Sequence, residues 1–521
     1  MKSLRRVFYF SVLFLFALTF LLSYLFSPYY LLLLILFIPY AVTGIYDCLQ
    51  KENNVNRNFP VAGHIKQLLV NNRELLQDWI FENELQIRPF DRIQREIVYR
   101  RAEDRQQTVA FGTRYDYYES GYEWMLHSNH PAEEIKEDLR VLVGGKDCTQ
   151  PYSCSILNVG GMSYGSISRN ATMALNGGAR LGNFASNTGE GGLTDYHLHY
   201  GGDVIFQFGT AYFGCRDKEG HFDEKEFERK AKTPQVKMTE IKISQGAKPG
   251  YGAILPGKKV TKEVARIRDI EPGVMVISPA GHSEFKNAVE LMHFIKKVRD
   301  ASGGKPVGYK FCLGQRREVI DMCRAMLETG IVPDFITIDG AEGGTGAAHF
   351  ESANRVGMPL EDAVPFVCNA LTGFGLKKNI RLFVSGKITS AFHIVRYLAL
   401  GADACYSARG MMFALGCVQA LQCDRDTCPT GITTMNEDLI QGLVPEDKKI
   451  KIYNYHRHTI AAVKDMLIAG GLHHVGEMNR SLICRRTGDN EIKTLEEIYP
   501  LIPEGSLLRH PYPPQFESIM Q

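Results

Sequence analysis

Two uncharged hydrophobic runs dominate the start of the chain. Residues 7–26 and 31–46 contain no charged side chain, and only the segment SPYY separates them. Each run is close to the roughly 20 residues that a helix needs to cross a bilayer. The turn is uncharged, whereas the outer ends are flanked by basic residues, which favours a cytoplasmic location for both ends; these residues are Lys2, Arg5, Arg6, Lys51 and Arg57.

We therefore expect a transmembrane hairpin of two helices over residues 1–50, which makes the protein a multi-pass protein of the cell membrane with a cytoplasmic catalytic domain. A single span and a cleaved signal peptide are the alternatives. The basic start of the chain fits a signal peptide, but the apolar stretch is too long and no small-residue cleavage site follows it.

The next hundred residues, 51–150, are polar and contain no glycine-rich motif. Residues 73–82 and 89–105 have the pattern of charged helices. We interpret this region as a mostly helical N-terminal extension that packs on the main domain and carries no chemistry of its own.

From residue 151 the pattern changes to short apolar runs that end in glycine-rich turns. Helical periodicity covers 285–301, 316–330 and 390–401 between them. Eight strands that alternate with helices indicate an α/β fold, and the number eight favours a closed TIM (β/α)8 barrel over a doubly wound sheet. The latter is also weakened because no glycine fingerprint opens a helix after the first strand. The candidate strands are 155–161, 183–189, 240–244, 274–278, 307–312, 335–340, 381–386 and 404–409.

We expect the barrel to occupy residues 151–475 and a C-terminal tail to occupy 476–521. The formal net charge of +2 equals the charge of residues 1–50, so the rest of the chain is neutral and gives no sign of nucleic-acid binding. The 12 cysteines are dispersed along a 58.6 kDa chain, unlike the disulfide framework of a small secreted domain. We interpret them as reduced.

Three cysteines form the strongest chemical motif. Cys417, Cys423 and Cys428 have the spacing C-x5-C-x4-C, and Pro429 follows the last of them. Thiolates are the usual ligands of iron–sulfur clusters, and a cysteine followed by proline is common there. The residues alone leave open a zinc site with a further ligand, or three cysteines that are grouped by chance.

Glycine-rich turns after the last two candidate strands resemble phosphate sites. VSGKI (384–388) and YSARG (406–410) follow the seventh and eighth strands, where barrels often bind phosphate. Ordinary strand-to-helix turns explain the same pattern. The candidate ligands are Gly386, Ser407, Ala408 and Arg409.

Several polar residues lie at strand ends or in glycine loops. Lys310 is in an apolar strand, where it needs a partner, either a barrel carboxylate or the negative charge of a reduced flavin. GAEGGTGAA (340–348) allows a close backbone approach to a ligand, although a tight turn explains it equally well. SNTGEGG (186–192) adds Glu190, and QGAKPG (245–250) adds Lys248. A lone histidine such as His282 is more often structural than catalytic.

In this order, the motifs resemble the FMN-binding synthase domain of glutamate synthase, from about residue 153 to 475. The extension 58–69 also resembles the stand-alone, membrane-tethered glutamate synthase-like proteins of bacteria. The matching segments are MSYGSIS (162–168), ASNTGEGG (185–192), EIKISQGAKPGYGAILPGKK (240–259), VISP (276–279), DGAEGGTGAA (339–348) and the three-cysteine segment with PTG (417–431).

The resemblance implies a TIM barrel with FMN at its C-terminal mouth and a [3Fe–4S] cluster on Cys417, Cys423 and Cys428. It implies that a 2-oxo acid lies near Lys248 and Glu190. The FMN phosphate would contact Gly386 and residues 407–409, and the flavin ring would contact Met162, Ser163, Asn187, Gln245, Lys310, Gly343, Gly344 and Thr345.

Some positions depart from the pattern of the large synthases. Tyr251 stands where QGAKPG is usually followed by glutamate, and Ala341 and Glu342 stand where a histidine–aspartate pair is usual. His282 keeps only one of two consecutive histidines. The chain passes from its first residues directly into the membrane segment, without the family's glutaminase domain, so we expect that it does not hydrolyse glutamine.

The resemblance implies an oxidoreductase that forms an amino acid by reductive amination of 2-oxoglutarate or a related 2-oxo acid, as in glutamate biosynthesis. Ammonia or an amine would come from elsewhere, and ferredoxin or an NAD(P)H-dependent partner would supply electrons. Lys310 would stabilise the reduced flavin, and Glu190 would carry a proton. The alternatives are a membrane-associated flavin dehydrogenase that oxidises an amine or amino acid, and a non-catalytic redox sensor or scaffold.

Overall fold

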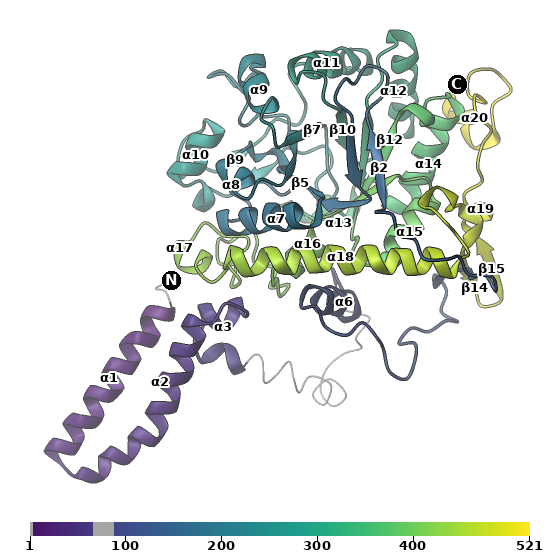
Figure 1. The fold of residues 1–521 in the computed structure, drawn as a ribbon. Coiled ribbons are helices and arrows are strands. Elements are labelled where there is room, and N and C mark those ends of the chain that lie inside the picture. The colour runs from purple at the N-terminus through teal and green to yellow at the C-terminus, as the bar shows by residue number, and fades with distance from the viewer. Residues whose placement is uncertain (1–3, 66–87, 521) are drawn as a thin grey trace.

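A computed structural model describes residues 4–65 and 88–520 of the chain (Figure 1). Its centre is a closed barrel of eight strands, and all neighbouring strands in it are parallel. The predicted TIM barrel is therefore confirmed. In chain order its strands are β4 (Leu157–Val159), β5 (Ala185–Asn187), β6 (Asp203–Phe208), β7 (Val236–Lys242), β10 (Val307–Phe311), β11 (Phe335–Asp339), β12 (Arg381–Ser385) and β13 (Ala404–Ser407).

Two details of the predicted strand order were wrong. The third strand of the barrel is β6, which the sequence reading missed, and the predicted strand at 240–244 is the end of the fourth strand, β7. The predicted strand at 274–278 lies outside the barrel, where β9 (Val276–Ile277) pairs antiparallel with β8 (Ile254–Leu255). Its apolar side chains face solvent, since Met275 is 58% exposed and Ile277 is 60% exposed.

Helices surround the barrel, and those predicted at 285–301, 316–330 and 390–401 are confirmed as α11, α12 and α15. The helices that follow the strands are α7 (Arg169–Gly182), α8 (Asp195–Leu198), α9 (Glu224–Ala231), α10 (Lys262–Arg268), α11 (Ala288–Ala301), α12 (Arg316–Thr329), α13 (Phe350–Arg355), α14 (Leu360–Gly373), α15 (Ala391–Ala399), α16 (Arg409–Ala414) and α17 (Glu437–Ile440).

The long helix α18 (Pro445–Ala469) lies along one side of the barrel and packs closely on α7 (Figure 1). Gly178 of α7 permits this approach, because a Cβ atom there would lie 2.3 Å from Cγ2 of Ile452. On its other side, α18 contacts α6 (Arg92–Ala102), which begins with a capping box of Asp91 and Gln94. The predicted helix at 89–105 and its packing on the main domain are confirmed, whereas the helix predicted at 73–82 lies outside the described residues.

The end of the chain forms a small sheet with the N-terminal extension. β14 (Ile483–Gly488) pairs antiparallel with β1 (Glu123–Met125) and with β15 (Glu491–Thr494). The remaining elements are α3 (Asn54–Asn58), the hairpin strands β2 (Arg140–Val143) and β3 (Tyr152–Ser155), α19 (Leu495–Ile498) and α20 (Pro514–Met520).

Two long apolar helices project from the body side by side (Figure 1). They are α1 (Leu4–Leu25) and α2 (Leu34–Leu49), and the short 3-10 helix Pro28–Leu33 directly precedes α2. The segments Arg5–Leu25 and Pro28–Leu49 are long and apolar enough to cross a membrane, although a signal sequence has the same properties. They approach closely at Gly44, where a Cβ atom would overlap the ring of Phe8. The short helix α3 connects them to the body.

Candidate functional site

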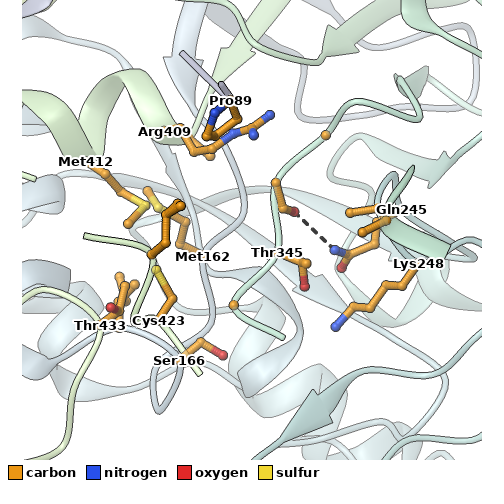
Figure 2. Close-up of a pocket in the computed structure, with 18 of the residues that line it drawn as sticks. Pro89, Met162, Ser166, Gln245, Lys248, Thr345, Arg409, Met412, Cys423 and Thr433 are labelled. Carbon is orange, nitrogen blue, oxygen red and sulfur yellow. Dashed lines mark hydrogen bonds between the residues drawn. The ribbon is translucent and has the colours of Figure 1, made fainter. Parts of the chain in front are cut away.

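A cavity of about 970 Å³ lies at the C-terminal ends of the barrel strands. Its walls come from the segments that follow β4, β5, β7, β11, β12 and β13. This volume is at the upper end of the range for small-molecule and cofactor sites, about 300–1,000 Å³. Figure 2 shows Cys423 and Thr433 on one side of the cavity, Gln245 and Lys248 on the other, and Arg409 beside Pro89. TIM barrels place their active sites at this end.

One part of the cavity wall carries three basic side chains, those of Arg88, Lys387 and Arg409. Burial, and then the charge of Arg409, lower the pKa of Lys387, while the carboxylate of Glu342 opposes this shift and Arg88 adds to it. Burial lowers the pKa of Arg409 to about 10, so its guanidinium stays protonated at neutral pH. Glu342 compensates part of the positive charge, but the three cations outnumber this carboxylate on the wall, which suits this part of the cavity to an anionic group such as a phosphate.

The glycine turn after β11 brings backbone close to these cations. Arg409 donates a hydrogen bond from Nη2 to the carbonyl of Glu342 at 2.6 Å. A Cβ atom at Gly344 would lie 2.8 Å from Nε of Arg409, so a larger residue there would displace the guanidinium. Nε2 of Gln245 donates to the carbonyl of Gly344 at 3.3 Å, which connects the turn to the opposite wall (Figure 2).

Three buried cations surround a single carboxylate on that wall. Glu190 forms an ion pair with Lys242, which also donates to the side-chain carbonyl of Gln245. Burial alone would raise the pKa of Glu190, but the charges of Lys242, Lys248 and Arg268 lower it, so the carboxylate is ionised. Burial, and then Lys242, lower the pKa of Lys248 to about 8. The four side chains together carry a net positive charge at neutral pH.

Arg268 comes from the last turn of α10 and is 2% exposed. Its Nη2 donates to the carbonyl of Tyr164 at 2.6 Å, and its guanidinium lies over the ring of Phe213 at 5.1 Å. Within the described part of the chain, its Nε atom has no hydrogen-bond partner. Because a buried donor without a partner is costly, Arg268 is suited to donate a hydrogen bond from Nε to a ligand.

Lys310 lies behind the cavity wall, in a layer of charges inside the barrel. Its Nζ is 3.2 Å from Oδ2 of Asp339, and its register partner on the neighbouring strand is Lys242. Burial alone would lower the pKa of Lys310, but the carboxylates of Asp339 and Glu240 raise it above its ordinary value. Glu240 in turn accepts hydrogen bonds from Asn187 at 2.8 Å and Thr337 at 2.6 Å, and also from Gln207.

The three predicted cysteines line the same cavity, beside Thr430 and Thr433. Sγ of Cys428 lies 3.2 Å from the hydroxyl of Thr430. Hydrogen bonds from Thr430 and Thr433 outweigh burial and lower the pKa of Cys428, which favours a thiolate. Across residues 4–65 and 88–520, however, no three cysteine, histidine or acidic side chains are close enough together to hold a metal ion, so the cluster remains a prediction.

The extension and α3 hold the cysteine segment from outside the barrel. The side-chain amide of Asn54 donates to the carbonyls of Leu415 at 3.1 Å and Thr430 at 3.3 Å. From α6, the hydroxyl of Tyr99 donates to the carbonyl of Cys417 at 2.6 Å. Thus α3, which follows the two apolar helices directly, contacts the backbone that carries the thiols.

Most residues proposed from the sequence come together in this cavity. Four of them, all within the described chain, do not line it: Asn187 and Lys310 lie in the charge layer, Ser407 donates to the carbonyl of Ile388 at 2.6 Å, and Gly386 lies beside Glu342. Those that line it are Met162, Ser163, Glu190, Gln245, Lys248, Gly343, Gly344, Thr345, Ala408, Arg409 and the three cysteines.

His282 is a structural residue. Its Nε2 is 3.0 Å from the carbonyl of Lys242, and its Nδ1 is 2.9 Å from the hydroxyl of Tyr212. Burial lowers its pKa to about 4, so the ring is neutral at physiological pH. With both ring nitrogens bonded, His282 supports the end of β7 and has no free nitrogen for acid–base chemistry.

Six charged residues of the site were not singled out from the sequence. Four of them lie inside segments quoted there, and Lys242, a lysine in an apolar strand, could have been found by the argument used for Lys310; the other three are Glu240, Asp339 and Lys387. Arg88 and Arg268 had no such signal, because single charges in ordinary helices and loops are common.

The barrel and its cavity define a TIM-barrel protein with a cation-rich site at the C-terminal mouth. Residues 132–473 match the family described as the conserved region in glutamate synthase, and the chain belongs to this family. It is 35% identical, over 88% of its length and 95% of the relative's, to the glutamate synthase large subunit-like protein YerD of Bacillus subtilis (strain 168).

More distant relatives match a smaller share of the chain. An archaeal-type glutamate synthase [NADPH] of Thermotoga neapolitana and an archaeal glutamate synthase [NADPH] of Methanocaldococcus jannaschii are each 33% identical, over 60% and 64% of this chain. The chain spans 59% and 62% of their lengths. Among solved structures, a mandelate oxidase matches 71% of this chain and 86% of its own, with 14% identity and a TM-score of 0.42.

Proposed function

We propose that the protein is an FMN- and iron–sulfur-dependent oxidoreductase that reductively aminates an anionic 2-oxo acid such as 2-oxoglutarate. The observation that carries this proposal is the arrangement of one cavity: the cations Arg88, Lys387 and Arg409, a second cation cluster around Glu190, and the three-cysteine segment share its walls. Family membership supports the same type of chemistry, since the relatives are glutamate synthases by name.

The cavity fits FMN in volume and charge. Arg88, Lys387 and Arg409 would hold the phosphate, and the backbone of the turn around Gly344 would lie beside it. Bound FMN supplies a carrier of two electrons, which the side chains of the protein cannot supply themselves. Lys310 would add positive charge behind the cavity wall, with Asp339 fixing its ammonium group.

The donor set of the cysteine segment fits an iron–sulfur cluster in its chemistry, with three thiols along one wall of the cavity. Cys417, Cys423 and Cys428 would hold the cluster, which supplies one-electron transfer between an external donor and the cavity. We propose ferredoxin or an NAD(P)H-dependent protein as the donor.

The cations around Glu190 would bind the carboxylates of the substrate. Lys248 and Arg268 carry positive charge into the cavity, and Arg268 has a donor to spare. The ion pair with Lys242 keeps Glu190 charged, so Glu190 orients these cations and accepts hydrogen bonds. Lys248, with a pKa of about 8, is the group that can give up a proton near neutral pH.

For each 2-oxo acid, the reaction consumes one ammonium ion, two electrons and two protons. The products are one water molecule and one amino acid with a protonated amino group. Nitrogen bonds to the keto carbon, the keto oxygen leaves as water, and two electrons and a proton reduce the resulting C=N bond. The cavity contributes by holding the acid beside the flavin and by keeping water away while the C=N bond is reduced.

The proposal is tested on the full chain in detergent. Flavin and broad iron–sulfur absorbance should accompany the purified protein, and with reduced ferredoxin or dithionite it should convert 2-oxoglutarate and 15N-ammonium to 15N-glutamate. Protein that carries the flavin but forms no labelled amino acid from any 2-oxo acid contradicts the proposal.

A second candidate is a dehydrogenase that oxidises an amine or amino acid and passes electrons to the membrane. The observation that favours it is the contact of α3, at the end of the two apolar helices, with the cysteine segment through Asn54. Bleaching of the flavin by amino acids without added reductant would identify this activity.

We also propose that α1 and α2 anchor the protein in the cell membrane, with the barrel in the cytoplasm. Their length, apolar composition and projection from the body support this proposal, together with the basic residues at both outer ends. In sealed vesicles with the cytoplasmic side outward, we expect added protease to cleave the barrel and to leave the hairpin intact.

A further inference from the structure

An exposed stretch with aromatic side chains connects α6 to β1. All residues from 103 to 120 are exposed, and we call residues 105–118 of this stretch the aromatic loop. Phe111 has its whole side chain in solvent and a left-handed backbone, with φ of 65°. Tyr118 is 78% exposed and Val109 is 57% exposed, and Tyr115 and Tyr117 are also among the exposed large side chains. Contiguous exposed apolar residues mark interaction sites.

The composition of the aromatic loop fits a lipid surface. Phenylalanine and three tyrosines within eight residues have the ring types that concentrate at membrane–water interfaces, where an apolar ring can be buried while a hydroxyl stays hydrated. The charged residues of the loop are Arg105, Arg114 and Asp116, and both arginines form ion pairs, Arg105 with Glu103 at 2.7 Å and Arg114 with Glu96 at 2.9 Å. The aromatic and apolar side chains, not a net positive charge, therefore give the loop its affinity for a membrane interface.

The position of the aromatic loop also favours a membrane. Figure 1 shows α6 and the stretch that follows it on the side of the body from which α1 and α2 project. The base of the loop is fixed to the body, because Tyr117 packs on Tyr122 with ring centroids 4.5 Å apart and Arg486 lies 5.4 Å from the ring of Tyr118. The base of the loop is thus held on the body, while Phe111 lies in the fully exposed part of it.

We propose that the aromatic loop is a second membrane contact, which inserts Phe111 and the neighbouring side chains into the headgroup region of the bilayer that holds α1 and α2. This inference rests on the proposed membrane attachment. Two separate points of contact would fix the tilt of the body on the membrane, and hence the orientation of the cysteine segment, which α3 and α6 hold from the same side.

The experiment measures how brominated lipids quench single tryptophans in the full chain, reconstituted into vesicles with anionic lipid. The native Trp79 and Trp124 are replaced by phenylalanine, and one tryptophan is introduced by Phe111→Trp. Leu327→Trp is the matched control, since Leu327 is a 46% exposed apolar residue on α12, away from the hairpin (Figure 1). Phe14→Trp reports on the anchor itself.

We expect Phe111→Trp to be quenched, and more strongly by bromines near the headgroups than by bromines near the chain ends, since interfacial side chains penetrate about 5–10 Å. Leu327→Trp should not respond. If Phe14→Trp is quenched but Phe111→Trp is not, the second contact is wrong while the anchor stands. If neither is quenched, the anchor is wrong and the proposal falls with it. If the fluorescence of Phe111→Trp falls with rising protein concentration and is the same with and without brominated lipid, the loop contacts another copy of the chain. That result would also overturn the proposal.

Discussion

The buried pair of Lys310 and Asp339 permits a prediction that separates structural support from a role at the flavin. In the variant Lys310→Met, Asp339 loses its cation at 3.2 Å, and its side chain is 4% exposed. Removal of one partner from a buried ion pair costs about 3–5 kcal/mol, because the other charge is left without compensation. Asp339 keeps the hydrogen bond from the backbone amide of Gly246 at 3.0 Å, while the charges of Arg409 and Lys242 act on it without an ion pair.

That loss should be visible as a lower unfolding temperature of the detergent-solubilised chain. With about 2.1 cal/mol/K of unfolding entropy per residue, a chain of 521 residues shifts by about 1 °C for each kcal/mol, which gives a decrease of about 3–5 °C. The double variant Lys310→Met/Asp339→Asn should recover most of it, because no unpaired charge remains and the amide oxygen introduced at position 339 can still accept from Gly246. A single variant that unfolds at the wild-type temperature would refute the reasoning.

A comparison of the two variants isolates the role at the flavin. Lys310→Met removes a positive charge and should make the bound flavin harder to reduce, since a positive charge nearby favours the anionic reduced form. The double variant removes one charge of each sign, so its flavin midpoint potential should lie closer to that of the wild type. An unchanged midpoint potential in Lys310→Met would limit Lys310 to its structural role.

Three further predictions concern the cation cluster, the cysteines and α3. The affinity for 2-oxoglutarate should fall as the pH rises through about 8, where Lys248 loses its proton, and Lys248→Met should weaken it about ten- to hundredfold, the range of a hydrogen bond to a charged group. Cys428→Ser should lose iron while it keeps FMN, whereas Cys148→Ser, at a cysteine outside the cavity lining, should keep both. Asn54→Ala should speed hydrogen exchange in residues 415–430, because two carbonyls lose their donor.

Each of these has a clear contrary result. A pH-independent affinity, measured by the change in flavin absorbance on binding, would remove Lys248 from the substrate site, and Lys248→Arg should keep tight binding to a higher pH. Equal iron content in the two cysteine variants would argue against the cluster. Unchanged exchange in Asn54→Ala would show that α3 does not support the cysteine segment.

The sequence was sufficient for the barrel but not for the identity of every strand. Seven of the eight barrel strands were found, because short apolar runs that end in glycine turns recur with helical segments between them. β6 was missed and residues 274–278 were taken in its place, since an apolar run has the same pattern whether its side chains are buried or, like Ile277, exposed. Hydrophobic periodicity does not report which runs pair with each other.

The site was predictable where residues share a local motif. The cysteines, the turn at 343–345 and the loop with Gln245 and Lys248 were found because spacing or glycine content marks them, and all line one cavity. Arg268 could not be found in this way, because only the folded barrel brings the end of a helix beside Glu190. Asp339 begins a quoted glycine segment, but its pairing with Lys310 depends on the fold. The burial that gives these charges their importance is a property of the fold.

The central claim is that this cavity holds a flavin beside an anionic 2-oxo acid, and a single-turnover experiment tests it most directly. The purified full chain is reduced anaerobically, excess reductant is removed, and flavin absorbance is followed after 2-oxoglutarate and ammonium are added. We predict that the flavin reoxidises only when both are present, with glutamate formed in proportion to the flavin. A flavin that stays reduced with every 2-oxo acid and amine offered would contradict the account.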